Sequence, residues 1–424
     1  MALSNKPYKG TRDFFPPDMR IHNAIFSSLS KVVENYGYEQ YNGPMLESFD
    51  LYAAKTGEEI VNAQLYHFED RGKRRVAVRP EMTPTLARMV SQQVQELPKP
   101  IRWFSLPNLW RYERPQRGRL REHWQLNVDL LGGDTRLADS EILSLAFNLI
   151  SEFKGQEHIQ IHINHRGLVN FVFQDQLGLS AEQALQVSKA VDARPKIGEA
   201  AYEKWLSDQG VNSDQAIKLE AFFKSDFTSL CENYPCEAID DLKAIFKNLE
   251  CSEAHKVLIF DPMIMRGLDY YTGLVFEIFD TSPENNRAMF GGGRYDNLIG
   301  LFGKHQLSGV GFGMGDVTLR NFLETHKLMP AIQAPIDYFV ALTNKDYWSY
   351  SQQICKVLRV KGHSVYEALS DVKLANQFKQ AHKLNSKFVI IVGEDEVAQK
   401  QFQLKELATG EQKTYALSEL EALD

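Results

Sequence analysis

The stretch that decides the fold is residues 111–131, "RYERPQRGRLREHWQLNVDLL", in which five arginines lead into an alternating strand. Its first part interleaves the arginines with Tyr112, Pro115 and Gly118, and from His123 onward polar and apolar residues alternate as in a half-buried strand. A strand, a basic loop and a returning strand make a hairpin. Because guanidinium groups so close together would repel one another without an anion, and arginine suits bidentate phosphate contacts, we expect an anion to bind here.

A second unusual peptide is residues 266–277, "RGLDYYTGLVFE", which places a cation, an acid and two adjacent tyrosines at the head of a strand-like run. Mostly apolar residues flank it, from Val257 to Phe260 and from Val275 to Phe279. Buried polar groups must find hydrogen-bond partners, and the nearby sequence supplies none for the arginine and the two phenols. A bound ligand is therefore expected to supply them.

The composition is that of an ordinary globular protein. The chain has 424 residues, 43% of them hydrophobic and 24% charged, which is enough for two or three domains with full cores. Four scattered cysteines indicate a reducing compartment rather than a disulfide framework. No run approaches the roughly 18 consecutive apolar residues that span a bilayer, so we expect a cytoplasmic protein with no membrane partner. The net charge of −7 alone gives no sign of nucleic-acid binding.

Three of the cysteines share one segment with a histidine and raise the question of a metal site. Cys231, Cys236 and Cys251 precede His255. The spacing of the first pair and the helical pattern around them favour core cysteines over metal ligands. No metal site made by cysteines is predicted.

Breaks in the periodic pattern divide the chain into domains of an α+β protein. The predicted boundaries are 1–166 and 254–327 for two parts of one core, 167–253 for a helical insertion, 328–334 for a linker and 335–424 for a small α/β domain. The insertion has apolar residues at helical spacing, and the last segment alternates short strands with helices.

Three shorter peptides leave more than one interpretation open. In "RPEMTP", residues 79–84, Glu81 and Thr83 suit an ammonium group, or else Thr83 caps the helix that follows. The glycines of "GGGRYDNLIG", residues 291–300, indicate either a turn before a helix or close approach of the backbone to a ligand. The basic run of residues 71–79 fits a solvated hairpin.

Several of these peptides resemble a known family. "RYERPQRGRLREHWQ" resembles motif 2 of class II aminoacyl-tRNA synthetases, and "RGLDYYTGLVFE" and "GGGRYDNL" resemble the two signature peptides of histidyl-tRNA synthetases. The peptides "YKGTRDFFPPD", "GYEQYNGPMLES", "RPEMTP", "KFVIIVGEDE" and "LKELATGEQ" fit the same family. The resemblance extends from about residue 8 to the end of the chain, although the helical insertion matches only in position.

The resemblance implies a fold and a reaction. The implied fold is an antiparallel six-stranded catalytic sheet with flanking helices, a helical insertion domain and a C-terminal α/β anticodon-binding domain, in a homodimer. The implied reaction joins histidine to ATP as histidyl-adenylate with Mg²⁺, and then transfers the histidyl group to the 3′ end of histidine tRNA.

The resemblance also implies roles for individual residues. Adenylation needs cations fixed where charge develops on the α-phosphate, and Arg111 and Arg266 match the arginines expected to be catalytic in this way. The resemblance assigns ATP binding to Arg111, Glu113 and Arg119, and contact with the acceptor end of the tRNA to Arg114, Gln116 and Arg119.

Histidine binding is implied for Glu81, Thr83, Arg111, Gln125, Asp129, Arg266, Tyr270 and Tyr271. Glu81 and Thr83 match positions that hold the α-ammonium group, with Gln125 beside them. A neutral imidazole has one donor and one acceptor, so its pocket needs an acceptor, Asp129, and a donor, Tyr271, with Tyr270 as a wall. Such a pocket rejects amino acids that leave these groups unpaired by a factor on the order of 10⁴.

Two positions depart from the family pattern. Asp129 stands where glutamate is usual, which moves the carboxylate back by one methylene. In the third motif, "GMGDVTLRNFLE", Val317 and Thr318 stand where Glu-Arg is typical, so the arginine expected to stack on adenine is missing. Arg320 lies two residues further on, about 200° around a helix, and a simple replacement by it is not expected.

Two other functions stay open on the sequence. Synthetase-like regulatory subunits of ATP phosphoribosyltransferase share the catalytic fold without charging tRNA, but they usually lack the anticodon domain and have degenerate signature peptides. A non-catalytic RNA-binding module has no need of Glu81, Gln125 and the tyrosine pair. A test for histidine-dependent pyrophosphate exchange distinguishes a ligase from both of these alternatives.

Overall fold

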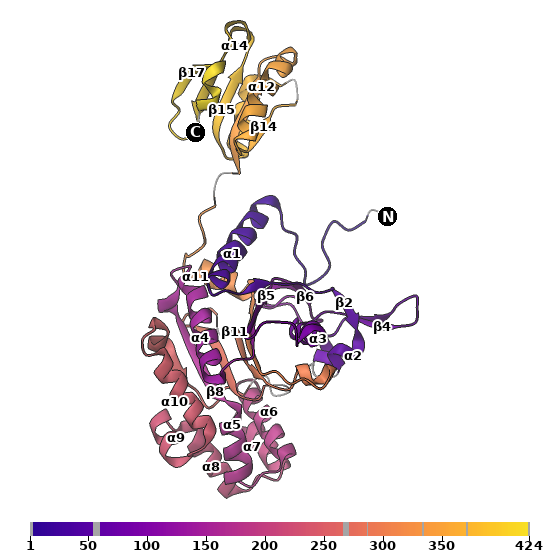
Figure 1. Cartoon of the computed structure of the whole chain (residues 1–424), viewed down its shortest axis with the longest axis vertical. Helices are drawn as coiled ribbons and strands as arrows, with labels where there is room; N and C mark the ends of the chain where they lie inside the picture. The colour runs from indigo at the N-terminus through magenta and orange to yellow at the C-terminus, as the bar shows by residue number, and fades with distance from the viewer. Residues whose placement is uncertain are drawn as a thin grey trace. The chain divides into compact units, whose positions relative to one another are not determined.

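The structure, a computed structural model, describes residues 3–53, 60–265, 271–285, 287–332, 335–369 and 372–422. It divides into two compact units, Met1–Pro330 and Ala331–Asp424, each with its own sheet and its own buried core (Figure 1). No helix within the described ranges is both long and apolar enough to cross a bilayer.

The centre of the first unit is a sheet in which six neighbouring strands run antiparallel, in the order β5-β7-β12-β11-β10-β8. Two short strands, β1 and β9, add in parallel at the edges, and β6 pairs with the start of β7. The bounds are β1 Glu39–Gln40, β5 Ile101–Ser105, β6 Asn108–Trp110, β7 Glu122–Leu131, β8 Ile159–His165, β9 Leu258–Phe260, β10 Leu274–Asp280, β11 Ala288–Tyr295 and β12 Gly309–Gly315. The predicted antiparallel sheet of six strands is confirmed.

One face of this sheet is covered by helices that form the main core. These are α1 Pro16–Asn35, α4 Thr135–Ser151 and α11 Asp316–Thr325. Val128, Phe276 and Phe312 point from the sheet into this core, where they are at most 5% exposed. Helix α4 begins where the side chain of Asp134 accepts a hydrogen bond from the backbone N–H of Leu137, which satisfies one donor that the first turn leaves open.

The other face carries smaller elements. Helix α3, Thr83–Gln93, packs on it, and Figure 1 places α3 and α4 on opposite sides of β11. Beside α3 lie α2 Phe49–Ala53 and a three-stranded sheet of β2 Leu46–Ser48, β3 His67–Glu69 and β4 Arg75–Val78. The turn between β3 and β4 is exposed and closed by an ion pair between Asp70 and Arg74, which confirms the solvated hairpin.

A group of helices fills the chain from residue 166 to residue 249 (Figure 1). The helices are α5 Arg166–Asn170, α6 Ala181–Ile197, α7 Glu199–Asp208, α8 Ser213–Lys224, α9 Phe227–Asn233 and α10 Glu237–Leu249. Capping boxes start α6 at Ser180 and α8 at Asn212, so local sequence sets where these helices begin. Cys231 and Cys236 pack against the core, and Cys251 is exposed.

The second unit is a five-stranded sheet in the order β14-β13-β15-β16-β17. Its elements are β13 Ile336–Leu342, α12 Trp348–Val360, β14 Val365–Glu367, α13 Leu374–Lys383, β15 Ser386–Val392, α14 Glu394–Gln399, β16 Gln401–Glu406 and β17 Gln412–Ala416. The first three strands in space are parallel, as an alternating strand and helix pattern requires. The sequence analysis did not predict α14 or β17; the side chains of β17 are mostly polar and exposed, so it lacks the apolar signal of a strand.

The glycine-rich peptide of residues 291–300 is not a turn at its start. Gly291, Gly292 and Gly293 lie inside β11, paired on both sides with β10 and β12. The interpretation as a turn before a helix is therefore wrong for the glycines, and only Ile299–Phe302 forms a short helical turn. The close approach that glycine permits here is to a neighbouring strand.

Gly292→Ala is expected to destabilise the first unit, because a Cβ at this position lies 2.0 Å from the carbonyl oxygen of Gly311 and 2.7 Å from the Cα of Phe312. Since backbone must move, we expect a loss of about 2–3 kcal/mol in the free energy of unfolding, measured by urea denaturation. Gly300→Ala is the control, because its Cβ meets nothing closer than the Cγ of Gln306 at 3.8 Å. Equal midpoints for the two variants would contradict this strand register.

Candidate active site

One face of β12 and of the adjoining part of β11 carries no side chains at a run of glycines. Every odd-numbered residue of β12, Gly309–Gly315, is glycine, and the residues between them are apolar. Successive residues of a strand point to opposite faces, so the apolar residues enter the helical core and the glycines lie together on the other side. Pairing with β11 places two more glycines beside them. We call this surface the glycine face: Gly291, Gly293, Gly309, Gly311, Gly313 and Gly315.

Polar side chains from β7 occupy the space that these glycines leave. A Cβ built on Gly313 would lie 2.4 Å from the Nε2 of Gln125, and one built on Gly311 would lie 2.5 Å from the Oδ1 of Asp129. Any larger residue at either position would push these groups away. The glycines therefore allow Gln125 and Asp129 to lie flat against the sheet.

Two tyrosines lie on the same face. The ring of Tyr271 comes within 3.0 Å of the Cβ position of Gly293, and the ring of Tyr295 within 2.6 Å of that of Gly309. The hydroxyl of Tyr295 donates a hydrogen bond to Asp129. Tyr295 was not among the residues predicted to contact a ligand. Its place two residues after Gly293, and therefore on the same face of the strand, is the sequence signal that would have identified it.

Asp129 is a buried carboxylate with one oxygen left over. Its side chain accepts from Tyr295 through Oδ1, and Oδ2 has no hydrogen-bond partner among the described residues. Burial raises the pKa of Asp129 to about 7, and the hydrogen bond from Tyr295 opposes this shift only in part. A buried acceptor without a partner is the type of group that a ligand N–H satisfies.

The loop before α3 meets the first arginine of the basic hairpin, by which we mean residues 108–124. The Nε of Arg111 donates to the carbonyl oxygen of Pro80, at 2.9 Å. The next residue, Glu81, is buried. Thr83 is the first residue of α3, but Met82 occupies the cap position and no side chain caps the helix, so the interpretation of Thr83 as the cap is wrong.

Helix α3 brings this loop to the glycine face. Leu86, Ala87 and Val90 form one apolar cluster with Tyr295, and Tyr271 packs against it. The helix thereby covers one end of the glycine face, and its N-terminal loop opens toward the basic hairpin. Four of the predicted histidine contacts, Glu81, Arg111, Gln125 and Asp129, come from these adjoining elements.

The arginines of the basic hairpin find partners within the chain. Arg119 forms an ion pair with Glu113, with an Nη2 to Oε1 distance of 2.6 Å, and Glu113 is buried. Arg121 donates to the carbonyl oxygen of Glu113 and to the hydroxyl of Tyr8, and it lies over the ring of Tyr112. The expectation that the arginines need a bound anion to avoid repulsion is therefore wrong for these two. Arg114 is exposed.

The tip of the hairpin is a tight turn. Gln116 and Arg119 exchange two backbone hydrogen bonds of 2.9 Å, and Gly118 takes the positive φ of 75° that the turn requires. Arg117 contacts Asn285 from the same tip. The side chains of Gln116 and Arg119 remain accessible to a large partner.

Three arginines lie around His123 at the base of the hairpin. Burial lowers the pKa of His123 to about 3, and the guanidinium groups of Arg111, Arg12 and Arg119 add to the effect. His123 is therefore neutral at physiological pH. Arg119 and Arg12 are paired with carboxylates, whereas Arg111 donates to the carbonyl oxygen of Pro80, so Arg111 is the cation that suits an anion here.

Comparison with known proteins identifies the family. The profile of the histidyl-tRNA synthetase family matches residues 10–317, nearly the whole first unit. The chain belongs to the histidyl-tRNA synthetase family. A profile of an anticodon-binding domain matches residues 337–423, so this member of the family also carries the second domain that the sequence predicted.

Individual relatives agree with this assignment. A histidine–tRNA ligase of Leptospira biflexa is 45% identical over 421 residues, covering 98% of this chain and 96% of that protein. The crystal structure of a histidyl-tRNA synthetase from Nostoc matches with a TM-score of 0.83 at 24% identity, over 99% of each chain. A protein from Bacillus halodurans described as an ATP phosphoribosyltransferase regulatory subunit/histidyl-tRNA synthetase matches with a TM-score of 0.77 at 20% identity, over 93% of this chain and 100% of that one. These structural likenesses speak for the fold alone.

The third motif of this histidyl-tRNA synthetase family member differs at Thr318. The hydroxyl of Thr318 donates to the carbonyl oxygens of Met289 at 2.6 Å and Gly315 at 3.1 Å, so it is held against the backbone. Gly118 of the basic hairpin approaches it, since a Cβ there would lie 3.4 Å from the Cγ2 of Thr318. The turn of the hairpin thus covers the position where the family pattern has an arginine.

Neighbouring arginines have other partners. Arg320 pairs with Glu324 at 2.8 Å and reaches Asp18 of α1 at 3.4 Å, so it faces the helical layer. Arg12 pairs with Asp316 at the start of α11. Arg266 and Tyr270, which the sequence analysis assigned to the site, lie outside the described residues.

Gly313→Ala is expected to raise the KM for histidine by displacing Gln125. The added Cβ would lie 2.4 Å from the mobile end of Gln125, so we expect little loss of stability and a roughly tenfold higher KM. Pyrophosphate exchange at varied histidine concentration measures this. Gly315→Ala is the matched control, because the nearest atom to its Cβ is the Oγ1 of Thr318 at 3.7 Å. The same KM in both variants would contradict a role for Gln125.

Asp129→Asn is expected to stabilise the protein more at pH 8 than at pH 5. Because burial raises the pKa of Asp129 to about 7, the folded protein keeps a proton that the unfolded chain releases near pH 4, and stability falls as pH rises between these values. A neutral amide removes this loss. The gain of Asp129→Asn in the free energy of unfolding, measured by urea denaturation, should be about 2–3 kcal/mol larger at pH 8 than at pH 5.

The control for this pH effect is Asp50→Asn, which changes an exposed carboxylate of α2. It should shift stability by the same small amount at both pH values. A gain for Asp129→Asn that does not depend on pH would show that the carboxylate ionises normally in the folded protein.

Proposed function

We propose that the glycine face is the floor of a site in which histidine reacts with ATP, before the histidyl group passes to tRNA. As a member of its family the protein is a histidine–tRNA ligase, an aminoacyl-tRNA ligase that uses ATP. The observation that carries the placement of the site is the gathering of Gln125, Asp129 and Tyr271 over glycines of β11 and β12.

In the proposed histidine pocket, Asp129 recognises the imidazole ring of histidine. Its Oδ2 is the acceptor for one ring N–H, and Tyr271 is the donor to the other ring nitrogen. Tyr295 holds the carboxylate through the other oxygen, which fixes the shorter aspartate at this place. Tyr270, which lies outside the described residues, is assigned to this pocket by the family resemblance alone.

The α-ammonium and carboxylate groups of histidine bind at the other end of the site. Glu81 and Thr83 accept from the ammonium group, with Gln125 beside them, and Arg111 faces the carboxylate and the α-phosphate. Arg266, which lies outside the described residues, is assigned to the same role by the family resemblance. The bond between Arg111 and the carbonyl of Pro80 supports this, because it keeps the guanidinium next to Glu81.

The proposed chemistry is in-line attack of the histidine carboxylate on the α-phosphate of ATP, with pyrophosphate leaving. Negative charge grows on the phosphoryl oxygens, and fixed guanidinium groups stabilise it without reorganisation. Arg111 and Arg266 have this role, while Glu113 and Arg119 hold the nucleotide. The position of Arg111 beside the basic hairpin, where it donates to the carbonyl oxygen of Pro80, supports the placement of the phosphates there.

Mg²⁺ accompanies ATP in this proposal. It keeps several of its waters and binds phosphate oxygens with one or two carboxylates, so it needs no cage of protein ligands. Among the described residues there is no group of three or more metal-binding side chains, and the buried carboxylate of Glu277, on the same face as Gly291, is a ligand of the kind that fits. When bound, Mg²⁺ would neutralise phosphate charge.

The proposed tRNA contacts are residues that are exposed at the tip of the basic hairpin. Arg114, Gln116 and Arg119 at the tip of the basic hairpin meet the acceptor end, and the second unit reads the anticodon, whose unstacked bases suit such recognition. We also propose a cytoplasmic homodimer. The exposed apolar side chains of Leu46 and Phe68 on the small sheet, and of Met45 just before it, support a partner surface there.

ATP–pyrophosphate exchange with each of the twenty amino acids tests the ligase. Exchange with histidine alone is the expected result, and a high ATP requirement would accompany the altered third motif. Histidine binding without exchange would favour a regulatory relative. That alternative has one observation in its favour, the threonine in place of the third-motif arginine, while the anticodon-binding domain counts against it.

Arg111→Ala is expected to lower kcat for exchange by a factor on the order of 10²–10³, because it removes one fixed cation from the developing charge. Arg111→Lys should recover part of the rate, since the charge returns without the planar fork. Arg194→Ala is the matched control: it removes an arginine that pairs with Glu199 and Glu220 in the helical segment. A similar rate loss in the control would trace the effect to general destabilisation.

A further inference from the structure

We propose that Arg294 is a positioning residue for the histidine pocket, which it serves by fixing the segment that carries Tyr271. The inference rests on the proposed function of the glycine face. Arg294 lies in β11 between Gly293 and Tyr295, so its side chain points to the opposite face and touches no substrate. It acts through its neighbours.

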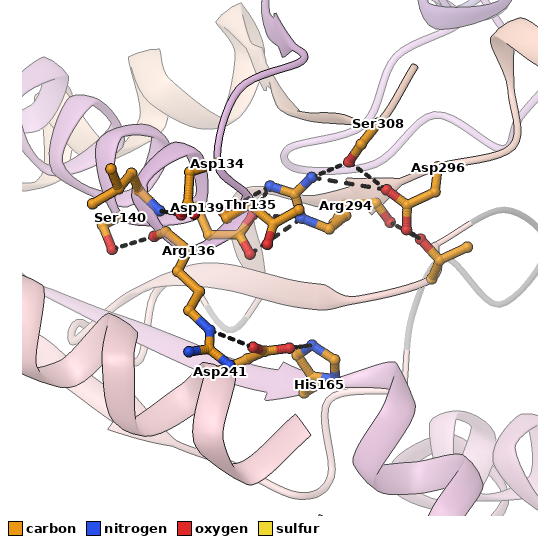
Figure 2. A network of polar contacts seen from close by, with 12 residues as sticks. Asp134, Thr135, Arg136, Asp139, Ser140, His165, Asp241, Arg294, Asp296 and Ser308 are labelled. Carbon is orange, nitrogen blue, oxygen red and sulfur yellow. Dashed lines mark hydrogen bonds and ion pairs between the residues drawn. The ribbon is translucent and has the colours of Figure 1, made fainter. Parts of the chain in front are cut away.

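The guanidinium of Arg294 has a full set of partners in a buried place. Its side chain is 6% exposed. Nε donates to Asp139 at 3.0 Å, and Nη2 donates to Asp139 at 2.7 Å and to the carbonyl oxygen of Thr135 at 2.9 Å. Nη1 donates to Ser308 (Figure 2). The planar fork of an arginine fits this bidentate geometry, and it fastens β11 to the first turns of α4.

The same residue holds the chain immediately after Tyr271. The backbone N–H of Thr272 donates to the carbonyl oxygen of Arg294 at 2.8 Å. The hydroxyl of Thr272 donates to Asp296, which also accepts from Ser308. The stem of Arg294 crosses Gly273, where a Cβ would lie 2.9 Å from the Cδ of the arginine. Residues 272 and 273 are therefore held by both the backbone and the side chain of Arg294.

The contacts of Arg294 affect the glycine face because its two neighbours in β11 lie on that face. The ring of Tyr271 lies over Gly293, the residue before Arg294, and Tyr295, which holds Asp129, is the residue after it. A shift of β11 at Arg294 therefore moves the floor under Tyr271 and the support of Asp129 together. Both groups proposed to read the imidazole depend on the position of this strand.

The first turn of α4 is itself held from the other side. Arg136 donates to Asp241 of α10 at 2.7 Å, and the Nε2 of His165 lies 3.5 Å from the same carboxylate (Figure 2). The Nδ1 of His165 accepts from the backbone N–H of Gly167 at 3.1 Å, where α5 begins. The helix that anchors Arg294 is thus tied to the base of the helical segment as well as to β11.

The decisive variant is Arg294→Lys, which keeps the charge but loses the fork. We expect the KM for histidine to rise roughly tenfold to a hundredfold, because groups misplaced by a fraction of an ångström bind poorly, while the KM for ATP changes by less than about twofold. Pyrophosphate exchange at varied histidine and at varied ATP measures both. Titration calorimetry of histidine without ATP should show the same loss of affinity.

Arg102→Met is the matched control. It removes another bidentate ion pair to α4, in which the Nε and Nη2 of Arg102 donate to Glu141 at 2.8 and 2.7 Å. This variant should lose thermal stability without a change in either KM. If Arg294→Lys lowers only the melting temperature, or raises both KM values equally, then Arg294 is merely structural and the proposal is overturned.

Thr272→Val keeps the test decisive if Arg294→Lys does not fold. It preserves the shape of the side chain and removes only the hydroxyl that contacts Asp296. The KM and Kd for histidine should rise in the same direction by a smaller factor, and unchanged values would overturn the proposal. Wild-type protein that binds histidine without exchange would overturn the ligase but leave the calorimetric test of Arg294 intact.

Discussion

The register between β7, β12 and β11 is the constraint on which the rest of the structure depends. Asp129 pairs with Gly311, and Gly311 pairs with Gly293. A slip of one residue would turn Phe312 toward the site and glycines toward the core. The core side of β12 prevents such a slip, because its apolar side chains are buried under α4 and α11. Packing on one face of the sheet thus determines the chemistry of the other.

Charge is balanced locally throughout the site. Arg119 lies against Glu113, and Arg111 is held by the carbonyl oxygen of Pro80, so these cations are already placed before any substrate arrives. A guanidinium that is held in position needs no reordering when phosphate charge develops. Asp129 is the exception, since one of its oxygens is buried without a partner among the described residues. The site therefore combines fixed cations with one acceptor that only a ligand satisfies.

The sequence predicted what depends on local pattern. Alternation identified β7 and the strands of the second unit, and glycine and arginine patterns marked the hairpin and the signature peptides. It failed where contacts join distant residues: Arg294 and Asp139 are 155 positions apart, and nothing local pairs them. It also left open a turn at Gly291 to Gly293, because glycine is rare in strands, and a local pattern does not show the neighbouring strand, whose carbonyl oxygen at Gly311 would lie 2.0 Å from a Cβ on Gly292.

The glycine face also limits how such a protein can change over generations. Glycine is the smallest residue, so every substitution on this floor adds atoms, and at Gly311 and Gly293 the first added carbon already meets backbone at 2.4 and 2.6 Å. At these two positions the floor cannot change by small neutral steps. Variation is left to the side chains that lie on it, as at position 129, where aspartate stands and a second tyrosine supports it. Packing thus leaves less room for change at Gly293 and Gly311 than at the side chains proposed to contact the substrate.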